Sequence, residues 1–198
     1  FTHGFQCRFE NAAPQPTAAG YREFAQKTFQ YVTLQLREAF RGLPVIIALG
    51  NHDSGCGNYR QDARDPFIAA IARTVAEAAA PDAPGSVARQ FARGGYYQLT
   101  LPAAGHARIV VINDIPMSRN FRACDGTAVP DAAQAQLQWL RQTLSEARTL
   151  QQPVWVVGHI PPGIEPWGSL KGQELCSRGR VLPLLADDQL SGLLGEYA

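Results

Sequence analysis

Short apolar runs alternate with longer segments of helical periodicity along the chain. Four apolar runs are predicted as strands, at residues 45–49, 95–101, 107–112 and 154–157. The first is short and is bounded by Pro and Gly, which is typical of a buried strand in a parallel sheet. The two middle runs are separated by a turn at residues 102–106, so they predict a hairpin at one edge of the sheet. Strands and helices in this order predict an α/β fold.

The first predicted helix follows a Pro/Ala-rich loop. It runs from Ala18 or Ala19 to Phe40, with Thr17 as its N-cap and Gly42 near its C-cap. Its aromatic stripe is assigned to the core, and the stripe includes Phe24 and Tyr31.

Three further segments have helical periodicity. Residues 65–79 predict an Ala-rich helix that is broken at residues 81–85. Residues 131–150 predict a long amphipathic helix, and residues 182–197 a final helix with a break near Pro183. The apolar stripe of the long helix consists of Ala135, Leu137, Leu140, Leu144 and Ala147.

Composition describes one folded domain with no sign of a polyanionic partner. The 198 residues are 45% apolar and 18% charged, which suits a globular domain with its own core. The formal net charge is +1, from 18 basic and 17 acidic residues, and no basic run is present, so nucleic acid is not expected as a partner. No apolar run reaches the roughly 18 residues that a membrane-spanning helix needs.

Four cysteines lie in Gly-, Pro- or polar-rich segments: Cys7, Cys56, Cys124 and Cys176. None forms a C-x-x-C pair, so a zinc ribbon or a thioredoxin motif is not predicted. An even number of cysteines in loops favours two disulfides, in any of three connectivities, and an exported protein. Four free thiols in a cytosolic protein are the alternative.

Three polar residues with catalytic chemistry follow the first predicted strand, in the sequence GNHD at 50–53. Ligands of open α/β sheets bind at the carboxyl ends of strands. Asn51 can offer an amide oxygen to a metal, and His52 can donate to a phosphate oxygen or protonate a leaving group. Asp53 could hold the His52 ring in one tautomer. An ordinary turn is the alternative, because Gly, Asn and Asp favour turns.

A second strand-Gly-His unit weakens that alternative. The sequence GHIPPG at 158–163 follows the strand at 154–157, and Pro161 and Pro162 stiffen the turn that carries His159. Two such units predict two imidazoles at the same end of one sheet.

The two motifs together resemble the calcineurin-like metallophosphoesterases, and most closely their acid sphingomyelinase-like phosphodiesterase branch. GNH followed by Asp or Glu occurs across the superfamily, and GHIPPG is the more specific motif. Matches at residues 110–113 and in the helix at 131–150 extend the resemblance from about His3 to the C-terminus. It implies a layered αββα domain over residues 1–198. That domain is expected to be partial, without the N-terminal metal-binding strand and the C-terminal Gly-His-x-His region.

The resemblance also implies two divalent metal ions, zinc, manganese or iron, and a bridging hydroxide that attacks phosphorus. Asn51 and His159 would ligate one metal. His52, oriented by Asp53, would contact the phosphate or protonate the leaving oxygen, and His3 would flank the leaving group. A catalytic zinc has about three protein ligands. With two, this chain alone is not expected to hold two metals tightly or to be active.

Two further residues are candidate substrate contacts. Tyr59 lies in the loop after GNHD, where a plain surface position is the alternative. Asn113 follows the strand at 107–112, and a loop-structuring role is preferred for it and for Asp114.

The predicted function is hydrolysis of a small phosphodiester of the lipid-head-group or nucleotide type. A phosphomonoesterase of the same superfamily is the first alternative, and a non-catalytic, disulfide-bearing binding domain on this fold is the second. No G-x-S-x-G motif is present, so a serine hydrolase is disfavoured. Cysteine usage and the resemblance favour a secreted or periplasmic location.

Overall fold

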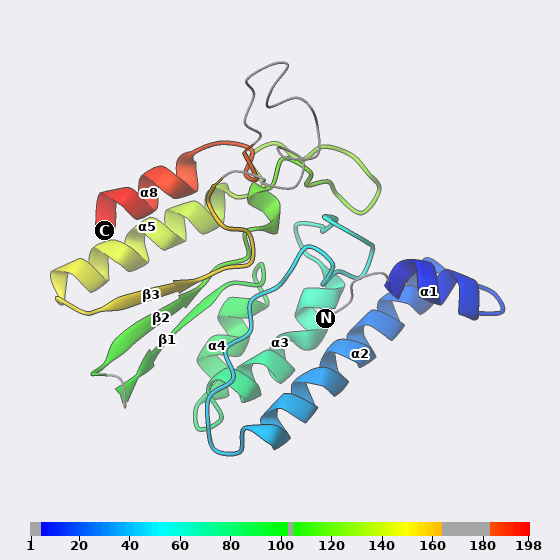
Figure 1. Cartoon of the computed structure of the whole chain (residues 1–198), viewed down its shortest axis with the longest axis horizontal. Coiled ribbons are helices and arrows are strands. Elements are labelled where there is room, and N and C mark those ends of the chain that lie inside the picture. The colour runs from blue at the N-terminus through cyan, green and yellow to red at the C-terminus, as the bar shows by residue number, and fades with distance from the viewer. Residues whose placement is uncertain (1–4, 103–104, 164–182) are drawn as a thin grey trace, which may run out of the picture.

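The computed structural model describes residues 5–102, 105–163 and 183–198 (Figure 1). The elements follow one another as α1 (Phe5–Ala12), α2 (Ala18–Ala39), α3 (Pro66–Ala79), α4 (Pro84–Phe91), β1 (Tyr97–Leu101), β2 (Ala107–Val111), the 3-10 helix η2 (Ile115–Met117), α5 (Gln134–Thr149), β3 (Val154–Val157) and α8 (Gln189–Tyr197). The predicted mixture of helices and strands is therefore confirmed.

The described residues form one three-stranded mixed sheet in the order β1-β2-β3. β1 pairs antiparallel with β2, with Leu99 opposite Ile109, which confirms the predicted hairpin. β3 pairs parallel with β2, with Val110 opposite Val156. Because β2 and β3 are parallel neighbours, the loops that follow them leave the same edge of the sheet.

Helices cover both faces of this sheet (Figure 1). Along β2 the side chains alternate, so Ile109 and Val111 join a core with α2, α3 and α4. Val110 and the following Ile112 join a second core with α5 and α8. The second sheet of the expected αββα layering is not found among the described residues, and that layering stays a prediction.

The segment at 45–49 is extended and buried but is not a strand. Ile47 and Leu49 are 4% and 1% exposed and lie in the first core. The backbone of Ile47 pairs with a side chain: its N–H donates to the Tyr97 hydroxyl, and that hydroxyl donates to the Ile47 carbonyl, both at 3.1 Å. The strand prediction is wrong for the described residues, in which the backbone of this segment bonds to the Tyr97 hydroxyl and, through the Val45 N–H, to the Ala78 carbonyl at 2.8 Å.

Helix α2 confirms the predicted bounds and N-cap. The Thr17 side chain accepts a hydrogen bond from the Gly20 N–H at 3.0 Å, and Gly42 follows the helix with a φ of 76°. The core assignment of Tyr31 is wrong, since it is 63% exposed. The face that is buried consists of Tyr21, Ala25, Phe29 and Thr33, at a spacing of four.

Two of the remaining helices were not predicted, and the others differ from the prediction at their ends. α3 confirms the helix at 65–79, with Asp65 as its N-cap. α4 and α1 were not predicted. α8 begins at Gln189, six residues beyond Pro183, while Leu182 lies outside the described residues. In the described part of the chain no helix is long and apolar enough to cross a membrane.

The face of α5 differs from the predicted stripe by one position. Ala135 is exposed and Gln136 is buried instead, at 4% exposure. The Gln136 side chain accepts from the Asn113 N–H at 2.7 Å and donates to the Asn113 carbonyl at 2.6 Å. A glutamine is buried here because it pairs with the backbone of the loop that follows β2.

Candidate functional site

The GNHD segment is a closed turn built on Asp53. The Asp53 carboxylate accepts a hydrogen bond from the Gly50 N–H at 3.0 Å, and the Asp53 N–H donates to the Gly50 carbonyl at 2.9 Å. Asp53 is only 7% exposed. Its charge reaches α2, where burial first and then the negative charge of Asp53 raise the pKa of Tyr21. The orientation of His52 by Asp53 stays a prediction.

The two predicted metal ligands meet. The His159 Nε2 atom lies 2.8 Å from the Asn51 Oδ1 atom, although the two residues are 108 positions apart. The Asn51 amide group donates to Asn58 Oδ1 at 2.7 Å, so its oxygen is the atom that faces the imidazole. Gly50 lies close to the same ring, since a Cβ added there would be 3.3 Å from His159 Cε1. The end of the buried 45–49 segment and the end of β3 therefore converge.

The backbone of the turn that carries His159 is hydrogen-bonded to the Asp114 side chain. The carboxylate oxygen Oδ2 accepts from the N–H of His159 at 2.8 Å and from the N–H of Ile160 at 2.7 Å. Asp114 has no exposed surface, and burial raises the pKa of its carboxyl to about 6 against the opposing effect of the two N–H donors. The preferred loop-structuring role of Asp114 is confirmed, but its link to His159 was invisible in the sequence.

Asn113 is buried, and its side chain is hydrogen-bonded to other loops. It has no exposed surface, and its amide group donates to Gln61 Oε1 at 2.9 Å and to the Gly94 carbonyl at 2.8 Å. These contacts connect the loop after β2 to the segments that precede α3 and β1. The loop-structuring role is confirmed, while a substrate contact by Asn113 stays a prediction that its burial does not favour.

Tyr59 lies beside the site through its backbone. Its N–H donates to the Asn51 carbonyl at 2.8 Å, and its φ of 55° is uncommon for a non-glycine residue. The side chain is partly buried against the second core. Its contact with a substrate stays a prediction. His3, the remaining candidate, lies outside the described residues, as does Cys176.

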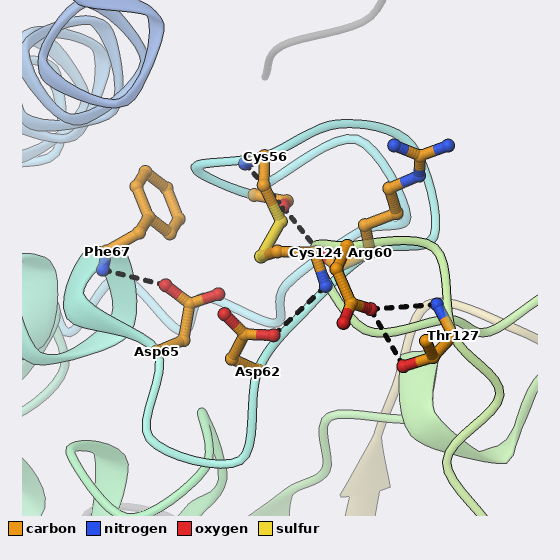
Figure 2. Close-up of a disulfide and its surroundings, with 9 residues drawn as sticks. Cys56, Arg60, Asp62, Asp65, Phe67, Cys124 and Thr127 are labelled. Atoms are coloured by element: carbon orange, nitrogen blue, oxygen red, sulfur yellow. Dashed lines mark hydrogen bonds between the residues drawn. A yellow bond between two sulfur atoms is a disulfide. The ribbon is translucent and has the colours of Figure 1, made fainter. Parts of the chain in front are cut away.

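A disulfide joins the loop that follows GNHD to the loop that follows η2 (Figure 2). It links Cys56 to Cys124, with 5.5 Å between their Cα atoms and 68 positions between them in sequence. Asp62 Oδ1 accepts from the Cys124 N–H at 3.0 Å and supports the same junction. One of the two expected disulfides is therefore present. Cys7 is exposed and has no cysteine partner within the described ranges.

The sulfur atoms of this disulfide and the Asp65 carboxylate form a group of possible metal ligands. The three ligand atoms lie within 4.8 Å of one another. Metals bind the thiolate form of cysteine, and in this oxidised protein both sulfurs are bonded to each other. Asp65 already caps α3, accepting from the Phe67 N–H at 2.8 Å (Figure 2). Only reduction would make this group available to a metal.

Asn51 and His159 are the better fit to a metal ion. An amide oxygen and an imidazole nitrogen are both suitable ligands for zinc, manganese or iron, and here they lie within hydrogen-bond distance of each other. Asn51 is half-buried and His159 is exposed, so an ion and a phosphate group could reach them from solvent.

Comparisons with known proteins give sphingomyelinase-like relatives, although no protein-family model matches the chain. The sphingomyelinase phosphodiesterase C of Dictyostelium discoideum is 30% identical over 132 residues, and the acid sphingomyelinase-like phosphodiesterase 3b of Homo sapiens is 33% identical over 134. Each alignment covers 67% of this chain and 28% of the relative. The cyclic GMP-AMP phosphodiesterase of Mus musculus is 25% identical over 144 residues, which are 72% of this chain and 31% of that protein. The chain thus spans less than a third of the length of these relatives.

Proposed function

We propose that this chain, which belongs with the acid sphingomyelinase-like phosphodiesterases by homology over about two thirds of its length, carries part of the active site of a metal-dependent phosphodiester hydrolase. The observation that carries the proposal is the 2.8 Å approach of Asn51 Oδ1 to His159 Nε2. The two side chains are hydrogen-bonded to each other, which puts an amide oxygen and an imidazole nitrogen close enough for both to turn towards a shared ion. The names of the relatives supply the reaction class.

In this scheme Asn51 and His159 hold one of two divalent ions, and the other ligands come from outside the described residues. When bound, such ions would supply a hydroxide nucleophile at neutral pH and would neutralise charge on the phosphoryl group. His52, next to Asn51, donates a hydrogen bond to a phosphate oxygen or a proton to the leaving oxygen. Asp53 keeps the turn closed by accepting from the Gly50 N–H, so that Asn51 and His52 stay in place.

The substrate is a small phosphodiester, of the lipid-head-group or the nucleotide type. Both types occur among the names of the relatives, which include sphingomyelin and cyclic GMP-AMP phosphodiesterases. The disulfide between Cys56 and Cys124 supports an exported protein, because disulfides persist in oxidising compartments. A monoesterase of the same superfamily would use the same residues and differ in its preference for monoesters.

Hydrolysis of bis-p-nitrophenyl phosphate and of the corresponding monoester by the purified protein tests the proposal. This chain alone is not expected to be active, so the assay needs a protein in which the remaining metal ligands are present. There we expect diester turnover with added manganese or zinc, its loss with a chelator, and a decrease of about 10²- to 10⁴-fold in His52→Ala. His106→Asn is the matched control, since His106 lies in a turn with a φ of 59° that asparagine tolerates. Preferred turnover of the monoester would select the alternative enzyme. Chelator-resistant turnover, or equal loss in both variants, would contradict the proposal.

A further inference from the structure

The carboxylate of Asp114 contacts the backbone on which a proposed metal ligand stands. Asp114 lies three residues beyond the end of β2, and His159 lies two residues beyond the end of β3. The two strands are parallel neighbours, with Val111 opposite Val157, and the pairing continues as the Ile112 N–H donates to the Val157 carbonyl at 2.9 Å. Because the strands are parallel neighbours, the Asp114 side chain in the loop after β2 lies against the backbone of the loop after β3.

One carboxylate oxygen holds two consecutive N–H groups. Asp114 Oδ2 is 2.8 Å from the His159 nitrogen and 2.7 Å from the Ile160 nitrogen. Ile160 is itself anchored, because it is 6% exposed and lies in the second core. The backbone of His159 is therefore fixed by the Asp114 carboxylate and by the buried residue that follows it. The imidazole ring extends from this backbone towards Asn51.

Gly158 makes this contact possible. A Cβ at Gly158 would lie 2.6 Å from Asp114 Oδ2 and 3.0 Å from Ile112 Cγ1, and both of those residues are buried. The glycine between strand and histidine is thus required by close packing of the carboxylate, in addition to any preference of the turn.

The other oxygen of Asp114 is costly to bury. Asp114 Oδ1 has no hydrogen-bond partner, and the residue is 0% exposed. A buried polar atom without a partner costs about 1–3 kcal/mol. The two hydrogen bonds that Oδ2 accepts offset this cost, and they require an acceptor oxygen at this position.

We propose that Asp114 is a positioning residue: with Gly158 it fixes the 158–160 backbone so that the His159 ring faces Asn51 and the metal that both would hold. This inference rests on the proposed function for its metal. The position of the ring can be tested without one.

The first readout is the position of the His159 ring in metal-free protein. It is monitored by the chemical shifts of the imidazole nitrogens and protons in NMR spectra. We expect Asp114→Ala to shift these signals, because the ring is no longer held at Asn51, and Asp114→Asn to restore them, because an amide oxygen can accept the same two N–H groups. Asp65→Ala is the control, since Asp65 is a buried N-cap at 6% exposure whose loss destabilises α3 without reaching His159. Unchanged signals in folded Asp114→Ala would overturn the inference.

The second readout is the dissociation constant for zinc or manganese, measured by calorimetry, with unfolding temperatures in chelator to report stability separately. Loss of an outer support of a metal ligand weakens binding about 10- to 100-fold. We expect such a loss in Asp114→Ala and a much smaller one in Asp114→Asn. A purely structural role predicts a lower unfolding temperature with unchanged affinity, which would refute positioning. Should wild type bind no metal even where the remaining ligands are present, the proposed function fails, and the ring signals still decide on positioning.

Gly158→Ala covers the case in which Asp114→Ala does not fold. It adds one methyl group against the carboxylate and should displace the His159 signals. In the double variant with Asp114→Asn, which keeps the acceptor and the volume, the displacement should persist. Absence of any shift in folded Gly158→Ala would contradict the contact on which the inference depends.

Discussion

Two loops bring the candidate ligands together, and they are held by different means. The loop that carries Asn51 continues to Cys56, where a disulfide fastens it to Cys124. The turn that carries His159 has no covalent support within the described residues and depends on the buried carboxylate of Asp114. One half of the site is thus stabilised by oxidation and the other by two hydrogen bonds from the neighbouring strand end. The comparison predicts that redox conditions and packing mutations affect the two halves separately.

The largest expected effect comes from breaking the covalent half. The Cys56–Cys124 bond closes a loop with a sequence separation of 68, for which chain entropy predicts about 4 kcal/mol of stabilisation. Cys56→Ser with Cys124→Ser should lower the free energy of unfolding by about that amount in urea titrations. The same titration in a strong dithiol reductant should reproduce the loss in wild type and leave the double variant unchanged. A wild-type protein equally stable in oxidant and reductant would contradict the assignment.

The non-covalent half should yield a somewhat smaller loss. Asp114→Ala leaves the buried Ile160 N–H and the partly buried His159 N–H without an acceptor, and it also removes the unpartnered Oδ1. The expected net loss is about 1–3 kcal/mol. Because the carboxylate and the disulfide share no partner, the loss should be the same in oxidised and reduced protein. Urea titrations in both conditions measure this. A loss that vanishes on reduction would show that the two halves are one cooperative unit.

The segment that leads into the Asn51 loop can be tested by pH. Burial raises the pKa of Tyr97 to about 12, above its usual 10. The folded protein then holds its proton while the unfolded chain loses it, so stability is retained below pH 10 and falls as the pH rises towards 12. The fall attributable to this group is at most about 2–3 kcal/mol. Tyr97→Phe should be less stable at pH 8, because two hydrogen bonds to Ile47 are lost, and should lack this part of the alkaline decline. Parallel curves of unfolding free energy against pH for wild type and Tyr97→Phe would contradict this assignment of the alkaline decline to Tyr97.

The smallest effect is expected at Asn58. Its side-chain oxygen accepts from the Asn51 amide group at 2.7 Å in an exposed position. Asn58→Ala should change the free energy of unfolding by about 0.5–1 kcal/mol at most. It should nevertheless raise the metal dissociation constant a few-fold, since the Asn51 amide group becomes free to rotate its oxygen away from His159. Asn120→Ala, an exposed loop asparagine far along the chain, is the control and should leave metal affinity unchanged.

The meeting of Asn51 and His159 was expected from the resemblance to the metallophosphoesterases, and the local pattern added only that two imidazoles should lie at one end of a sheet. Each residue follows an apolar run and a glycine, and strand ends gather at one edge of a sheet. The same logic misjudged the first apolar run, since the Tyr97 hydroxyl, 50 positions away, takes the hydrogen bonds of Ile47. Apolar patterning reports burial, and it cannot report which group satisfies the backbone.

Other features depended on contacts that no local pattern contains. α4 was missed because Pro84 was interpreted as part of a break, whereas proline at the first position of a helix is favourable. Tyr31 was assigned to the core because it is aromatic, although the buried face of α2 is the neighbouring one. Asp114 and Gly158 are ordinary loop residues in sequence, and only the parallel pairing of β2 with β3 puts one against the other.

The most direct measurement of the central claim is calorimetric titration of the purified, chelator-stripped protein with zinc and with manganese. Wild type, His159→Ala, Asn51→Ala and the control His106→Asn would be compared under oxidising conditions. We predict binding by wild type and by His106→Asn, and affinities at least about tenfold weaker in both site variants, because each removes one ligand. Equal affinity in all four proteins would mean that Asn51 and His159 do not hold the metal and would contradict the proposed site.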